Sequence, residues 1–220
     1  MRPLIFLIII FISCAPYTTT YSGNDSIKHS NDEMELFKNE YSKYDLKDVD
    51  TILDVGSGNG YFDAELFRFY PKTFFILEDT YIGYKKENRS FILVNGKPVY
   101  FKNNSKFVGG KDDSIPLPSA SYKLILCRKS VHEFKNPAKM VNELRRVLAD
   151  DGILIIEDLI PKFSGEIDPY CKMRHLSKEE LLSLFPKKDF KLISSDTTTY
   201  PIKKKEHYNC NIIKFKKNIS

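Results

Sequence analysis

From about residue 32, short apolar runs alternate with segments whose apolar residues recur at helical spacing. The clearest apolar runs are residues 51–55, 73–77, 123–127 and 153–156. Runs of this length, bounded by polar residues, predict strands that are buried on both faces. Helices alternating with such strands are typical of parallel βαβ units. The pattern therefore predicts an α/β domain with helices on both faces of a mostly parallel sheet.

Capping and helix-ending residues mark the expected helices. The helix after residue 60 is expected to end at Pro71, because proline cannot continue a helical ladder. Asn136 and Pro137 form a cap and a first-turn proline for the helix that follows the strand at 123–127. Ser177 and Glu180 form a capping box that opens a later helix.

The remaining elements are expected around this regular unit. Asp151-Gly152 is predicted to turn the chain into the strand at 153–156, and residues 190–193 and 211–215 are predicted as two final strands. Residues 91–94 and 98–101 flank Asn95-Gly96, which is the sequence of a type I′ turn. An inserted hairpin is therefore expected there.

Composition fits one globular domain and argues against two kinds of partner. A chain of 220 residues with 42% hydrophobic content can bury a single core. The net charge of +5 comes from scattered lysines such as those at 203–205, with no basic stripe interleaved with aromatics, so no nucleic-acid partner is expected. Cys14, Cys127, Cys171 and Cys210 lie far apart without a C-x-x-C pair, so no metal site is expected.

The first residues differ from the rest of the chain. Arg2 precedes nine apolar residues at 4–12, and Ser13-Cys14 follow. Nine helical residues rise only about 14 Å, too little to span a bilayer core of about 30 Å. The segment 1–14 resembles a bacterial lipoprotein signal peptide, which implies export and a membrane anchor at a lipidated Cys14. The alternative is an uncleaved apolar N-terminus on a cytoplasmic protein.

Residues 15–31 are rich in Thr, Ser, Asn and Gly and predict a flexible tether. The catalytic domain is then expected over residues 32–220. Translation from Met34 would begin just before this domain and would also give a cytoplasmic protein.

A glycine-rich loop follows the first predicted strand. Gly56, Gly58 and Gly60 lie between a strand and a helix, where a backbone without Cβ atoms allows a nucleotide-like ligand to approach closely. A dinucleotide fingerprint also requires glycine at position 61, which is Tyr61 here. Asp54 lies beside the loop. A carboxylate there would attract a ligand with ammonium and sulfonium groups and would repel a pyrophosphate.

The stretch Thr51-Ile-Leu-Asp-Val-Gly-Ser-Gly-Asn-Gly60 resembles the first motif of class I S-adenosylmethionine (SAM) dependent methyltransferases. Residues 115–158, with Arg146-Val-Leu148 and Gly152, are similar to a second conserved region of that family. The resemblance implies a Rossmann-like fold with a mostly parallel seven-stranded sheet and an antiparallel last strand. It also implies SAM as the cofactor and methyl transfer as the reaction.

The resemblance assigns cofactor contacts to particular residues. The loop contacts are Asp54, Gly56, Ser57, Gly58 and Gly60. An acid at the end of the second strand is expected to accept hydrogen bonds from the ribose hydroxyls. This acid is Glu78 or, one residue later, Asp79. The acid near the adenine amino group is Asp112 or Asp113.

Two positions depart from the family pattern. Lys123 stands where an aspartate is usual at the start of the fourth strand, and Asp151 replaces the first glycine of a pair. Neither change removes an expected cofactor contact, but both indicate a divergent member.

Methyl transfer from a sulfonium requires in-line positioning and no obligatory catalytic residue. If a base is used, His132 and Glu133 are the candidates, because they follow the fourth strand at the end where ligands bind in open α/β sheets. A structural or pocket-wall role for His132 is the alternative. Arg128 begins the same loop and is a candidate for contact with the cofactor or an acidic substrate.

The sequence does not identify the methyl acceptor, which can be a small molecule or a protein, nor the oligomeric state. A membrane-anchored, non-catalytic binding module with a methyltransferase-like fold is the alternative function, because an exported domain would lie apart from the cytoplasmic supply of SAM. A nicotinamide oxidoreductase is disfavoured by Tyr61.

Overall fold

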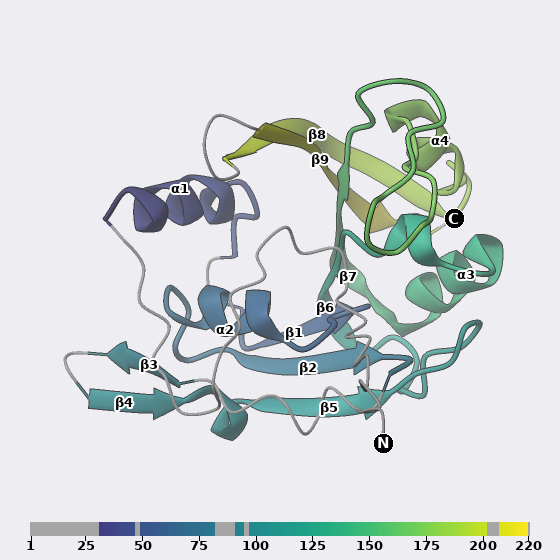
Figure 1. Cartoon of the computed structure of the whole chain (residues 1–220). Coiled ribbons are helices and arrows are strands. Elements are labelled where there is room, and N and C mark those ends of the chain that lie inside the picture. Colours follow the sequence, from purple (N-terminus) through teal and green to yellow (C-terminus); the bar gives the residue numbers. More distant parts are fainter. Residues whose placement is uncertain (1–30, 47–48, 82–90, 95–96, 202–206, 220) are drawn as a thin grey trace, which may run out of the picture.

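Figure 1 shows the computed structural model of the chain, which describes residues 31–46, 49–81, 91–94, 97–201 and 207–219. The predicted signal segment, Cys14 and residues 15–30 of the tether lie outside the described residues, as does the Asn95-Gly96 turn. Within the described ranges, no helix is both long and apolar enough to cross a membrane.

A seven-stranded sheet in the order β5-β2-β1-β6-β7-β9-β8 forms the centre of the fold. The pairs that join β5, β2, β1, β6 and β7 are parallel, while β9 is antiparallel to both β7 and β8. The strands are β1 (Thr51–Val55), β2 (Phe74–Asp79), β5 (Ser105–Gly109), β6 (Tyr122–Arg128), β7 (Leu148–Leu159), β8 (Phe190–Pro201) and β9 (His207–Lys217). The predicted mostly parallel sheet with an antiparallel last strand is confirmed.

Within the described residues, four helices cover the two faces of this sheet (Figure 1). They are α1 (Asn31–Ser42), α2 (Tyr61–Phe67), α3 (Pro137–Val147) and α4 (Lys178–Ser183). One buried cluster joins α3 and α4 to Ile125 and Cys127 of β6, and the other joins α1 and α2 to Leu124 and Leu126 of the same strand. Successive strand residues thus enter opposite cores, because strand side chains alternate between faces.

The helix starts agree with the sequence. Asn136 accepts a hydrogen bond from the Lys139 amide at the start of α3, and Ser177 and Glu180 form the reciprocal capping box of α4. The predicted hairpin is also present, as the antiparallel pair β3 (Phe91–Val94) and β4 (Lys97–Tyr100), which is followed by the 3-10 turn η2 (Phe101–Asn103).

Strand boundaries were predicted less well. The turn expected at Asp151-Gly152 is wrong, because β7 already begins at Leu148, directly after α3. The register of β7 against β6 instead shifts between Tyr122 and Leu124, which absorbs the residues around Gly152 as an irregularity in the strand. Strands β8 and β9 extend well beyond the predicted residues because they pair with each other over most of their length.

Candidate functional site

A cavity of about 240 Å³ opens at the carboxyl ends of β1, β2 and β6. Strand β1 lies between β2 and β6, so the strand order runs outward from β1 in opposite directions. Such a position is a topological switch point, where ligands bind in open α/β sheets. The cavity is lined by Val55, Gly56, Glu78, Asp79, Thr80, Lys111, Asp112, Lys129, Ser130, Glu133, Phe134, Lys135 and Met140. Five of the predicted site residues are among them.

The glycine loop has the backbone that only glycine adopts without strain. Gly56, Gly58 and Gly60 have φ angles of 76°, 58° and 73°. A Cβ on Gly56 would lie 2.5 Å from the Cβ of Ser130, which follows β6. Glycine at 56 therefore lets the loop pack against the neighbouring strand end and form one wall of the cavity.

The amides of the loop are already occupied. The N–H groups of Gly56 and Ser57 donate to the carbonyl oxygen of Glu78 over 2.9 and 3.0 Å. The N–H of Gly58 donates to Oδ2 of Asp79 over 2.9 Å, and that of Gly60 donates to the Ser57 carbonyl. A phosphate site requires amides that point at the ligand. The loop is thus tied to the end of β2 and is poorly suited to a pyrophosphate.

Two buried carboxyls lie beneath the loop. Asp54 and Asp63 are 2% and 0% exposed, within hydrogen-bond reach of each other. Burial raises the pKa of Asp63 to about 7 and, together with repulsion from Asp63, raises the pKa of Asp54 well above its usual range. Two such carboxyls share a proton, because both cannot ionise in one buried site. They would favour a cationic ligand group near the loop.

The end of β2 brings both ribose candidates to the cavity. The Asp79 carboxylate accepts hydrogen bonds from the amides of Gly58 and Tyr81, over 2.9 and 2.8 Å, so it supports the loop. Burial, with a smaller contribution from Asp79, raises the pKa of Glu78 to about 8. The Glu78 carboxyl lies against Gly110, where a Cβ would be 1.5 Å from Oε1. Of the two, Glu78 has the carboxyl available to a ligand.

The two adenine-side candidates are exposed and paired with lysines. Asp112 Oδ2 lies 2.7 Å from Lys135 Nζ, and Asp113 Oδ2 lies 3.1 Å from Lys139 Nζ. Only Asp112 of the two lines the cavity. The geometry therefore favours Asp112 over Asp113 for a ligand contact.

The two departures from the family pattern lie outside the cavity lining. Lys123 Nζ and Asp151 Oδ2 are 3.5 Å apart in an exposed ion pair. Such a pair contributes about 0–1 kcal/mol to stability.

Arg128 lies in a buried ionic cluster and does not line the cavity. Its guanidinium is 3.1 Å from Glu157 at the end of β7 and 3.4 Å from Glu40 of α1, and it stacks on the ring of Phe62. The geometry gives Arg128 a role in joining α1 to the sheet, in place of the predicted contact with the cofactor.

The same cluster explains how α1 is held. Burial, and then repulsion from Glu157, raises the pKa of Glu40 to about 8. Tyr44, just after α1, donates a hydrogen bond to Glu157. Tyr41 packs edge-on against Phe62 of α2, with ring centroids 5.5 Å apart. The sequence reasoning missed this helix, although Glu40, Tyr41 and Tyr44 have the spacing of one helical face.

The two base candidates differ in access. Glu133 lines the cavity and its side chain is 33% exposed, whereas the His132 imidazole is fully buried. Burial lowers the pKa of His132, but hydrogen bonds to Asp158 and Cys171 outweigh it and raise that pKa to about 10. A buried imidazole that holds its proton is unsuited to act as a base on a ligand in the cavity. Glu133 remains the candidate.

Residues 27–197 match the family described as "Methyltransferase domain". The uncharacterized methyltransferase YcgJ of Bacillus subtilis is 31% identical over 131 residues, which are 58% of this chain and 47% of that protein. The tRNA U34 carboxymethyltransferase of Campylobacter concisus is 22% identical over 159 residues, or 67% of this chain and 53% of that protein. The chain thus spans about half the length of these curated relatives.

Solved structures share the fold. A SAM-dependent methyltransferase of Methanosarcina mazei superposes with a TM-score of 0.63 at 15% identity, covering 82% of this chain and 98% of that one. With the family match over most of its length, the seven-stranded sheet and the glycine loop at its switch point, this chain belongs to the methyltransferase domain family.

Proposed function

We propose that this chain is a methyltransferase that uses SAM and binds it in the cavity at the ends of β1, β2 and β6. The observation that carries the proposal is the chemistry of the loop. The amides of Gly56, Ser57 and Gly58 donate to Glu78 and Asp79, and buried carboxyls lie beneath the loop. This arrangement suits a ligand with cationic groups and hydroxyls and disfavours a pyrophosphate, which supports SAM over a nicotinamide dinucleotide.

Particular residues would hold the cofactor. Glu78 would accept hydrogen bonds from two ribose hydroxyls, because a carboxylate has two acceptor oxygens. Gly56 lets the ligand approach the backbone, and Asp112 would accept from the adenine amino group. Asp54 and Asp63 would supply negative charge toward the amino-acid end of the ligand.

When bound, SAM supplies a methyl group that its sulfonium has already activated. The protein therefore has to hold the acceptor in line and keep water away from the cavity. Glu133 is the cavity residue that would hold or remove a proton of the acceptor. The acceptor itself is a small molecule or a protein.

Calorimetric titration of the purified full chain with SAM, S-adenosylhomocysteine and NAD tests the proposal. We expect micromolar affinity for the first two ligands and none for NAD. Asp54→Asn and Glu78→Ala should each lower the affinity for SAM at least tenfold, or about 1.4 kcal/mol. Asp113→Asn, whose side chain lies outside the cavity lining, is the matched control.

Two outcomes of this titration would count against the enzyme. Binding of NAD in place of SAM would overturn the cofactor assignment. Failure of a folded chain to bind either SAM or S-adenosylhomocysteine would instead support the non-catalytic module. A larger loss of affinity from Asp79→Ala than from Glu78→Ala would move the ribose contact by one residue.

A further inference from the structure

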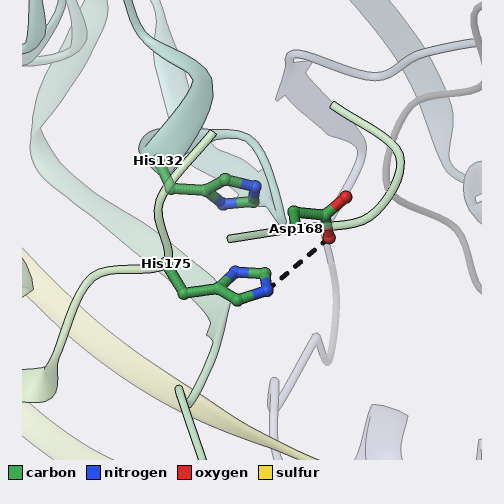
Figure 2. A group of neighbouring side chains, drawn as sticks. All are labelled: His132, Asp168 and His175. Atoms are coloured by element: carbon green, nitrogen blue, oxygen red, sulfur yellow. Dashed lines mark ion pairs between the residues drawn. The ribbon is translucent and has the colours of Figure 1, made fainter. Parts of the chain in front are cut away.

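A cluster of buried side chains lies beside the cavity, where the connection between β7 and α4 meets η3 (Val131–Glu133). Figure 2 shows His132 of η3 above His175, with Asp168 beside His175. These residues are 6%, 3% and 2% exposed. One possible ligand atom from each lies within 4.8 Å of the others. We propose that this cluster binds a zinc ion that fixes the connection to the sheet.

His132 is oriented as a metal ligand. Its Nδ1 lies 2.7 Å from Oδ1 of Asp158 on β7, and Oδ2 of Asp158 accepts the His132 backbone N–H. A carboxylate that accepts from Nδ1–H leaves Nε2 as the atom for an ion, and this arrangement accompanies most histidine ligands of metals. Nε2 points toward Cys171, so the ion would replace the proton on this nitrogen.

Asp168 is also held in place with one oxygen directed to the cluster. Its Oδ1 accepts the amides of Tyr170 and Cys171, over 2.6 and 3.0 Å. Its Oδ2 lies 3.6 Å from Nε2 of His175, too far for a good hydrogen bond. Two ligands of one tetrahedral zinc lie about 3.3 Å apart, given zinc–ligand distances of about 2.0–2.1 Å. The separation therefore suits a shared ion better than a direct bond.

His175 faces Asp168 with Nε2, so this nitrogen would bind the shared ion. A neutral imidazole that binds a metal through Nε2 carries its ring proton on Nδ1. In the part of the chain that the structure describes, Nδ1 of His175 is buried without a hydrogen-bond partner, so this nitrogen is not a ligand of the same ion.

Three protein ligands make up the cluster. Two imidazoles and a carboxylate suit zinc better than magnesium or calcium, and they leave the fourth tetrahedral position open. Cys171 lies 3.5 Å from Nε2 of His132 through its Sγ, but it groups with His132 and Glu133 and not with Asp168 and His175.

The position of the cluster defines its role. Residues 160–177, between β7 and α4, form no helix or strand, only an isolated bridge between Ile167 and Arg174. Connections of this length without secondary structure are uncommon inside a compact domain and are usually either functional or linker segments. Asp168 and His175 belong to this connection and His132 belongs to η3, so an ion bound by all three would join the two segments. The ion would hold this connection next to Glu133, which lines the cavity.

The test is the metal content and melting temperature of the full chain, purified without a histidine tag. After incubation with equimolar Zn²⁺ and gel filtration, we expect about one zinc per chain. Free zinc at about 100 times its dissociation constant should raise the melting temperature by about 5–10 °C. Neither measurement depends on SAM or on methyl transfer, so this inference and the proposed function fail separately.

Variants locate the ion. Asp168→Asn and His175→Ala should each lower the bound zinc at least tenfold, whereas His207→Ala, in β9, should leave it unchanged. A folded wild-type chain that retains no zinc, or Asp168→Asn that retains as much as wild type, would overturn the site.

Discussion

Glu78→Gln is expected to stabilise the ligand-free protein at alkaline pH. The pKa of this carboxyl is raised to about 8, chiefly by burial, from 4.5 in the unfolded chain. Between these values the folded state holds a proton that the unfolded state has lost, so the free energy of unfolding falls as pH rises from about 5 to 8. A shift of this size, at about 1.4 kcal/mol per unit, corresponds to about 4–5 kcal/mol above pH 8.

The glutamine keeps the shape of the side chain but does not ionise. We therefore expect the variant to lose this carboxyl's part of the pH dependence and to exceed wild type in stability at pH 8. Its affinity for SAM should nevertheless fall about tenfold, because one of the two ribose acceptors is lost. Urea unfolding from pH 5 to 8, without ligand, measures the first effect, and calorimetry at pH 8 measures the second.

Glu179→Gln is the matched control, because Glu179 is an exposed residue in the first turn of α4. It should follow the wild-type curve. If Glu78→Gln also followed the wild-type curve from pH 5 to 8, or were less stable at pH 8, the carboxyl would not be the buried, protonated group described above.

Three further predictions concern the loop, the ionic cluster and the N-terminus. Gly56→Ala should abolish SAM binding and should unfold at a lower urea concentration than Gly165→Ala. Both glycines have positive φ, which costs an alanine about 1–2 kcal/mol, but only a Cβ at position 56 would clash with Ser130. Arg128→Met should lower the free energy of unfolding by about 3–5 kcal/mol, because it removes the guanidinium that Glu40 and Glu157 contact in the buried cluster. The control Arg145→Met removes a partly exposed ion pair with Asp189 and should lower it by at most about 1 kcal/mol. Intact mass of the protein from its native cell should show a lipid on Cys14, and a species that starts at Met34 would contradict it.

Local sequence patterns predicted most of the elements in their order, although not α1. The strands around the glycine loop, the Asn136 cap and the Ser177 capping box each depend on residues close together in the chain, and each is present in the structure. The ribose-binding acid could likewise be predicted as Glu78 or Asp79, because both directly follow a local apolar run. Hydrophobic periodicity and turn residues are local signals, so they can be interpreted without knowledge of the fold.

Contacts between distant segments could not be predicted in this way. The sequence placed Arg128 at the end of a strand, near a ligand site. Only the tertiary structure puts Glu40 and Glu157 against its guanidinium, because α1 packs over the ends of β6 and β7. The choice between Glu78 and Asp79 likewise depended on which carboxylate the Gly58 amide binds.

The cluster at η3 shows the same limit most clearly. The spacing of these residues in the sequence does not indicate a metal site, because His132 lies more than 30 residues before Asp168 and His175. Folding brings one possible ligand atom of each within 4.8 Å of the others, since the connection after β7 returns to η3. Local periodicity therefore predicted the parallel α/β sheet, and the glycine spacing with its family resemblance predicted the cofactor loop. Which charged and ligand-forming side chains meet could be learned only from the three-dimensional structure, because those contacts depend on long-range packing.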